Sequence, residues 1–87
     1  MNIIDIAKLL AEHPQGSFLD LVQFNGHSVQ TCTITGVSPV WEMHPDTDEL
    51  FVILEGLFEL TLIEPHAQTH HKDAPGSCFV VPKGLWH

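Results

Sequence analysis

Residues 41–50, WEMHPDTDEL, place imidazole and carboxylate groups beside strand-forming side chains. In an extended strand, side chains two positions apart share a face, so Glu42 and His44 are expected to point the same way. Pro45 ends that strand, and Glu49 opens the next apolar run, where the chain can return it to the same side. Ionisable groups on one interior face are costly unless they have partners. A bound divalent cation would supply such a partner, so the segment indicates a metal site.

A second pattern lies at residues 76–87, GSCFVVPKGLWH. Its spacing of glycine, proline, glycine and histidine, together with the first segment, resembles the two sequence motifs of the cupin superfamily. The first motif of that family is a His-x-His pair, a glutamate and a glycine, and its counterparts here are Glu42, His44, Glu49 and Gly56. The second motif matches at Gly76, Pro82, Gly84 and His87. The resemblance covers residues 41–87, with glutamate where the first histidine usually stands.

This resemblance implies an all-β fold, a cupin-type double-stranded β-helix, or jelly-roll barrel, whose two motifs supply metal ligands to the interior. Carried over by position, the ligands are His44, Glu49 and His87, with Glu42 as a fourth. The implied cofactor is a divalent transition metal: iron, manganese, nickel or zinc. Two imidazoles and a carboxylate on one face of an ion leave positions open for substrate or oxygen, as in non-haem iron sites.

The glutamate at position 42 leaves three alternatives open. As a ligand, Glu42 would give the ion a second carboxylate, which favours hard ions and weakens Lewis acidity. Outside the ligand set, it could act as a general base beside the open metal positions. In the third alternative the site is degenerate and holds no metal.

Other polar and aromatic residues are assigned structural roles. Asp46 and Asp48 are expected to shape the turn after Pro45. The three histidines in HAQTHHKD are expected in a polar loop without a functional site; they are His66, His70 and His71. Core or interface packing is expected for Trp41, Met43, Phe51 and Trp86. Cys32 and Cys78 do not form a CxxC pattern and are predicted to be small buried side chains in a reducing cytoplasm.

The elements that position these residues can be read from hydrophobic periodicity and turn residues. A helix is expected over residues 3–12, stopped by residues 13–16, within an N-terminal arm of residues 1–13. Short strands with Asn25-Gly26 and residues 36–39 as turns then indicate a single domain with a β-barrel over residues 17–87. Further expected features are a strand pair over residues 50–54 and 57–63 joined at Glu55-Gly56, a polar loop over 64–76, and a last strand over 77–82.

The net charge and the resemblance to cupin domains limit the binding partners that are expected. Eleven Asp and Glu against three Lys and Arg give a formal charge of −8, which repels nucleic-acid phosphates and anionic lipid. A small molecule or a cation is the expected partner, with no nucleic acid and no membrane. Cupin domains continue beyond the second motif, so this chain resembles a shortened barrel whose open sheet edges would favour a homodimer.

Two functions follow as expectations. The first is a small cupin barrel that binds a divalent metal in its interior and acts on a small organic molecule by oxidation or isomerisation. The alternative is a non-catalytic ligand-binding or sensor module with a degenerate or structural metal site. A purely structural dimerisation unit is a third reading, and one barrel fold hosts all three.

Overall fold

The structure is a computed structural model that describes residues 1–14, 16–38 and 40–87. In these ranges the chain forms one short helix and six strands, so the expectation of a mostly β chain with a short helix is confirmed. The chain divides into two compact units, Met1–Val37 and Ser38–His87. The predicted stop at residues 13–16 and turn at 36–39 include Gln15 and Pro39, which lie outside the described residues.

The first unit begins with helix α1, Ile6–Glu12. Asp5 has an extended backbone, with φ −86° and ψ 99°, and its side chain accepts a hydrogen bond from the backbone N–H of Lys8. Asp5 is therefore the N-cap, which satisfies a backbone donor that the first turn leaves free. The predicted helix is confirmed, but it begins at Ile6 rather than Ile3 because Asp5 caps it.

The predicted hairpin at Asn25-Gly26 is also confirmed. Strand β1, Leu19–Phe24, pairs antiparallel with β2, His27–Thr31, and the register shifts at a bulge between Asp20 and Val22. Asn25 has φ 51° and Gly26 has φ 77°, the two successive positive values that a tight hairpin turn of this kind needs.

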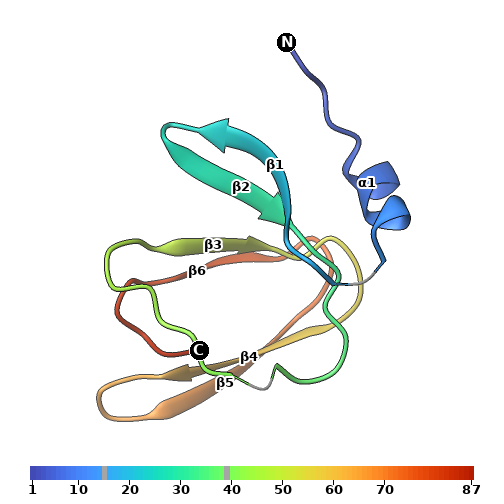
Figure 1. Ribbon diagram of the computed structural model, residues 1–87. Helices are drawn as coiled ribbons and strands as arrows, with labels where there is room; N and C mark the ends of the chain where they lie inside the picture. The colour runs from blue at the N-terminus through green and yellow to red at the C-terminus, as the bar shows by residue number, and fades with distance from the viewer. Residues whose placement is uncertain (15, 39) are drawn as a thin grey trace. The chain divides into compact units, whose positions relative to one another are not determined.

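The second unit contains two further strand pairs (Figure 1). Strand β3, Glu49–Val52, pairs antiparallel with β6, Cys78–Val81, and β4, Phe58–Ile63, pairs antiparallel with β5, Gln68–Asp73. Two predictions are therefore wrong. The runs joined at Glu55-Gly56 do not pair with each other, and the loop expected over residues 64–76 contains β5. The sequence QTHHKD has no apolar side chain, so its pairing with β4 leaves no hydrophobic alternation to read.

The interior of the second unit lies between these two strand pairs. Ile53, Leu60 and Val81 are its buried side chains, exposed by 7%, 7% and 2%. The rings of Phe51, Phe58 and Phe79 stack with centroids 5.0 to 6.0 Å apart, which confirms packing for Phe51. The prediction of core burial is wrong for two aromatic side chains, because Trp41 is 51% exposed and Trp86 is 46% exposed. Their expected interface role stays a prediction.

The described strands form three two-stranded sheets and no closed barrel. The coarse expectation of a β-rich chain holds, and the jelly-roll arrangement stays a hypothesis. In the same residues, no helix has the length and apolar content needed to cross a membrane. The expected single domain, homodimer and cytoplasmic location stay predictions.

The two cysteines differ in their surroundings. Cys78 is exposed, which contradicts its predicted burial: β6 turns it away from the interior, toward the same face as Val80. Cys32 is partly buried, and desolvation raises the pKa of its thiol.

Alkylation should follow this difference. Because the thiolate is the nucleophile, we expect iodoacetamide at pH 8 to label Cys78 faster than Cys32, and the rate at Cys32 to rise only at higher pH. Mass spectrometry of timed samples measures both rates, and in urea the two rates should converge. Faster labelling of Cys32 in the folded chain would contradict this assignment.

Candidate metal centre

Backbone pairing brings the two sequence motifs together. The N–H of Glu42 donates to the carbonyl of His87 at 2.8 Å, and the N–H of His87 donates to the carbonyl of Glu42 at 2.9 Å. The N–H of Gly84 donates to the carbonyl of His44 at 2.8 Å. Residues 42–44 thus run beside residues 84–87, although the pairing is too short to count as a regular strand.

The side chains of this paired region converge as predicted. One ligand atom each from Glu42, His44 and His87 lies within 4.8 Å of the other two. The rings of His44 and His87 have centroids 5.6 Å apart. The expectation that Glu42 and His44 share a face is therefore confirmed.

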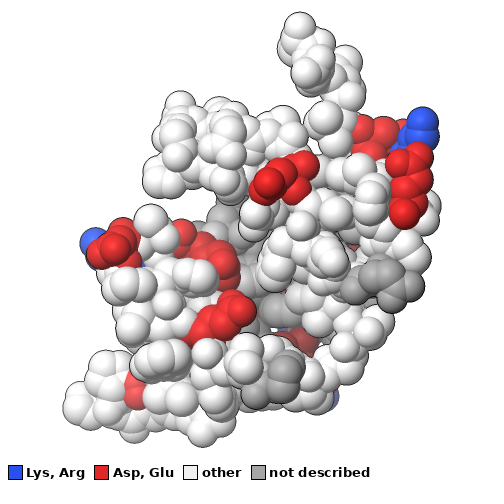
Figure 2. Space-filling model, viewed as in Figure 1, with Lys and Arg blue, Asp and Glu red and all other residues white. Residues whose placement is uncertain are grey.

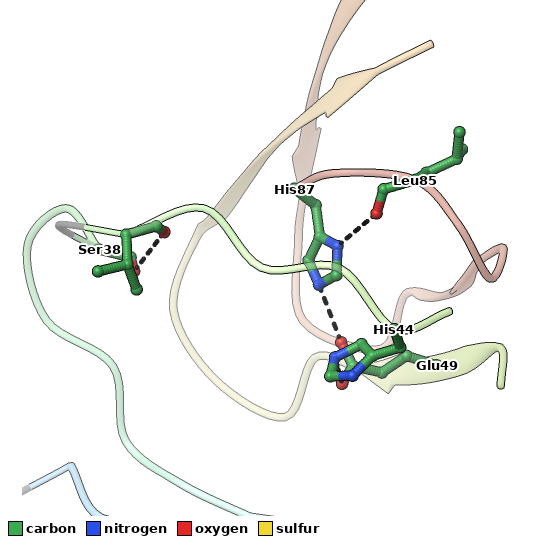
Figure 3. A network of polar contacts seen from close by, with 6 residues as sticks. Ser38, His44, Glu49, Leu85 and His87 are labelled. Atoms are coloured by element: carbon green, nitrogen blue, oxygen red, sulfur yellow. Dashed lines mark hydrogen bonds and ion pairs between the residues drawn. The ribbon is translucent and has the colours of Figure 1, made fainter. Parts of the chain in front are cut away.

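Glu49, the first residue of β3, joins both histidines. Its Oε2 lies 3.1 Å from Nε2 of His44, and its Oε1 lies 3.2 Å from Nε2 of His87 (Figure 3). Glu49 thus contacts both histidines, although it is not one of the three residues whose ligand atoms all lie within 4.8 Å of one another. We call Glu42, His44, Glu49 and His87 the four-residue centre.

Both ring nitrogens of His87 lie 3.2 Å from an oxygen acceptor. Nδ1 of His87 lies 3.2 Å from the carbonyl oxygen of Leu85 (Figure 3). A carbonyl can only accept, so this hydrogen bond requires a proton on Nδ1. In the neutral ring Nε2 then carries a lone pair, which faces the carboxylate of Glu49. Two acceptors face each other unless the ring is protonated or a cation lies between them.

His44 presents the same problem more sharply. Its Nε2 is buried and has no hydrogen-bond partner among the residues that the structure describes. The Oε2 atom of Glu49 is 3.1 Å away, but proximity alone does not align the two groups for a hydrogen bond. A buried nitrogen without a partner costs free energy. A metal ion would take up this lone pair, so the residues present fit a divalent cation.

The four side chains are exposed to different degrees. The His87 side chain is 6% exposed, compared with 34% for Glu49 and 41% for His44, and Glu42 is exposed. The edge of Phe51 packs against the His87 ring, with centroids 6.3 Å apart. With neutral imidazoles the centre carries two negative charges, and acidic side chains outnumber basic ones on the face seen in Figure 2. This charge favours a cation over an anion.

Asp48 has a positioning role that the sequence did not reveal. Its Oδ1 accepts a hydrogen bond of 2.9 Å from the backbone N–H of Lys83, 35 positions away. The predicted turn-shaping role of Asp48 stays a prediction, because the partner of its carboxylate lies in the second motif and not in the turn after Pro45. Together with the bond from Gly84 to His44, it ties the loop between His44 and Glu49 to the segment that carries His87. No periodicity could have signalled a bond from a side chain to so distant a backbone group.

The histidines within residues 66–71 lie outside the group that converges at Glu42. His70 on β5 contacts Thr61 Oγ1 through Nδ1 at 2.8 Å, and its Nε2 lies 3.5 Å from Glu59. Both side chains of this His70–Glu59 pair are about half exposed, at 51% and 50%. His66, His70 and His71 are not part of the four-residue centre, and the expectation that they form no functional site stays a prediction.

Comparisons with known proteins give one relative. The chain is 34% identical over 86 residues to the "Uncharacterized protein YdbB" of Bacillus subtilis (strain 168). The match covers 99% of this chain and 71% of that protein. No family model matches the chain. No solved structure matches it. At this identity and coverage, the chain belongs to the same family as YdbB of Bacillus subtilis.

Proposed function

We propose that this chain binds one divalent transition metal ion through His44, Glu49 and His87, and uses it to act on a small organic molecule. The observation that carries the proposal is the buried Nε2 of His44, which has no hydrogen-bond partner in the described residues and lies beside the Glu49 carboxylate. The lone pair of His87 Nε2, implied by the Leu85 contact, faces the same carboxylate. A cation bound here would pair with the lone pairs of both imidazoles and with the carboxylate at once.

The chain's own groups supply orientation and proton transfer. The Leu85 carbonyl holds the His87 ring with Nε2 toward Glu49, an arrangement that also raises the basicity of the ligating nitrogen. Glu42 is the exposed member, so its carboxylate is the group best placed to take a proton from a molecule that enters from solvent. When bound, the ion would supply Lewis acidity or a site for oxygen.

We also propose that the second unit is part of a cupin-type jelly roll. Two facing strand pairs with phenylalanine rings between them support this reading, as does the convergence of both motifs. The order of the chain agrees, since two of the proposed donors are His44, in the segment before β3, and Glu49, its first residue, and the third, His87, lies in the segment after β6.

Calorimetric titration tests metal binding. Metal-free protein without an affinity tag is titrated, without oxygen, with Mn²⁺, Fe²⁺, Ni²⁺ and Zn²⁺ in turn. We expect one binding site for at least one of these ions. The control is His70→Ala, because His70 forms a similar but exposed pair with Glu59, and this variant should retain the site. Heat released equally by native protein and His44→Ala would assign the binding to other surface groups and contradict the proposal.

Asp48→Ala should weaken metal binding without unfolding the chain. The substitution removes the acceptor for Lys83 N–H and loosens the loop between His44 and Glu49. Loss of such a supporting contact costs about 10- to 100-fold in metal affinity. Titration measures the loss, and Asp46→Ala in the same loop is the matched control.

Asp48→Asn should restore most of the affinity, because an amide oxygen can accept the same hydrogen bond. Equal losses in Asp48→Asn and Asp48→Ala would show that the charge of Asp48, and not this bond, matters.

A further inference from the structure

A hollow of about 160 Å³ opens beside β4, β5 and β6, apart from the four-residue centre. Four of its six lining residues are apolar, and the other two are a histidine and an aspartate. The lining residues are Leu60, Leu62, His71, Asp73, Phe79 and Val80.

The strand register explains how polar groups reach this apolar wall. Leu60 is paired with His71 and Phe58 with Asp73, so each polar residue lies on the same face of the sheet as its apolar partner. The neighbouring residues on β5, His70 and Lys72, point to the other face, where both contact Glu59. The placement of His71 and Asp73 is therefore set by the pairing of β5, which the sequence did not predict.

Aromatic rings connect the hollow with the four-residue centre. Phe79 lines the hollow and stacks on Phe51, with centroids 5.0 Å apart and planes inclined by 13°. Phe51 in turn packs edge-on against His87. Phe58 lies nearly parallel to both phenylalanines, at 27° to Phe51 and 23° to Phe79. A planar ring bound in the hollow would contact Phe79, which in turn stacks on Phe51 and Phe58.

Volume and charge restrict what the hollow can hold. An apolar cavity of about 150 Å³ is known to accept benzene, so the size suits one ring with a small substituent. The described residues that line the hollow include no lysine or arginine. Asp73 offers an acceptor and a negative charge, which attracts a hydrogen-bond donor or a cation and repels a carboxylate or phosphate.

We infer that this hollow binds a single-ring aromatic molecule with a hydrogen-bond-donating or cationic substituent, such as an arylalkyl amine. The ring stacks on Phe79, and the substituent donates to Asp73. The inference goes beyond the proposed function, because the hollow shares no residue with the four-residue centre and the binding requires no metal.

Binding of benzylamine tests the inference. Titration followed by NMR of the ¹⁵N-labelled chain should show saturable shifts at residues around the hollow for benzylamine, and much weaker binding of benzoate and of butylamine. Asp73→Asn should lower the benzylamine affinity about tenfold, since it removes a charged acceptor. Glu59→Gln, on the opposite face of the same sheet, is the matched control and should bind as the native chain does.

The outcome separates this inference from metal binding. The same titration is repeated with His44→Ala, and metal content is measured on the same samples. Equal benzylamine binding by native protein and His44→Ala supports the hollow, whatever the metal content. No saturable binding in either form, or benzoate binding as tight as benzylamine, would overturn the inference and leave the metal proposal to its own measurement. An unchanged affinity in Asp73→Asn would also overturn it.

Discussion

Glu49→Gln is expected to lower metal affinity by more than about 100-fold, because loss of a direct ligand exceeds the 10- to 100-fold cost of losing a supporting contact. The carboxylate oxygens of Glu49 lie against both histidines, at 3.1 and 3.2 Å. Glutamine keeps the shape of the side chain, but its amide group is a poorer metal donor and removes a negative charge.

The loss of metal affinity can be measured as a smaller stabilisation of the folded chain by added metal. At free metal 100 times the native dissociation constant, binding should stabilise the native chain by about 2.7 kcal/mol. With affinity reduced 100-fold, Glu49→Gln should gain only about 0.4 kcal/mol at the same metal concentration. Glu59→Gln, which alters the exposed His70–Glu59 pair, is the control and should gain as much as the native chain. Equal stabilisation of Glu49→Gln would exclude Glu49 as a ligand.

Leu60→Ala is expected to cause the largest loss of stability. Leu60 is 7% exposed, and only Ile53 and Val81 are buried with it in the described chain. A buried leucine replaced by alanine costs about 2–5 kcal/mol, compared with a total free energy of unfolding of about 5–15 kcal/mol for a typical domain. A large fraction of the variant should therefore be unfolded at moderate urea concentrations.

The chain offers a control of the same residue type. Leu50 is 65% exposed on the opposite face of β3 from Phe51, so Leu50→Ala should change the free energy of unfolding by about 0.5 kcal/mol or less. Urea unfolding followed by circular dichroism measures both variants. If Leu50→Ala is as damaging as Leu60→Ala, the outer face of β3 is covered in solution and its exposure here is misassigned.

The sequence predicted the four-residue centre better than it predicted the strand pairing. Alternation along a strand is a local property, so residues 42–44 alone indicated that Glu42 and His44 point the same way. The contribution of Glu49 and His87 came from the spacing within two motifs. Each of these signals depends on residues close together in the chain.

Long-range pairing could not be read in the same way. Strand β3 pairs with β6 and not with its neighbour β4, and a choice between such partners depends on packing across the whole unit. Strand β5 carries only polar side chains, so its local sequence resembles a loop. The exposure of Trp41 and Trp86 was missed for a related reason: aromatic type indicates burial only on average.

Metal content tests the central claim most directly. Native protein without an affinity tag, His44→Ala, Glu42→Ala and the control His70→Ala are reconstituted, dialysed and measured by elemental analysis, with folding checked by circular dichroism. We expect near-stoichiometric metal in the native chain, His70→Ala and Glu42→Ala, since three donors remain without Glu42, and none in His44→Ala. No metal in the folded native chain, or equal metal in native protein and His44→Ala, would contradict the proposed centre.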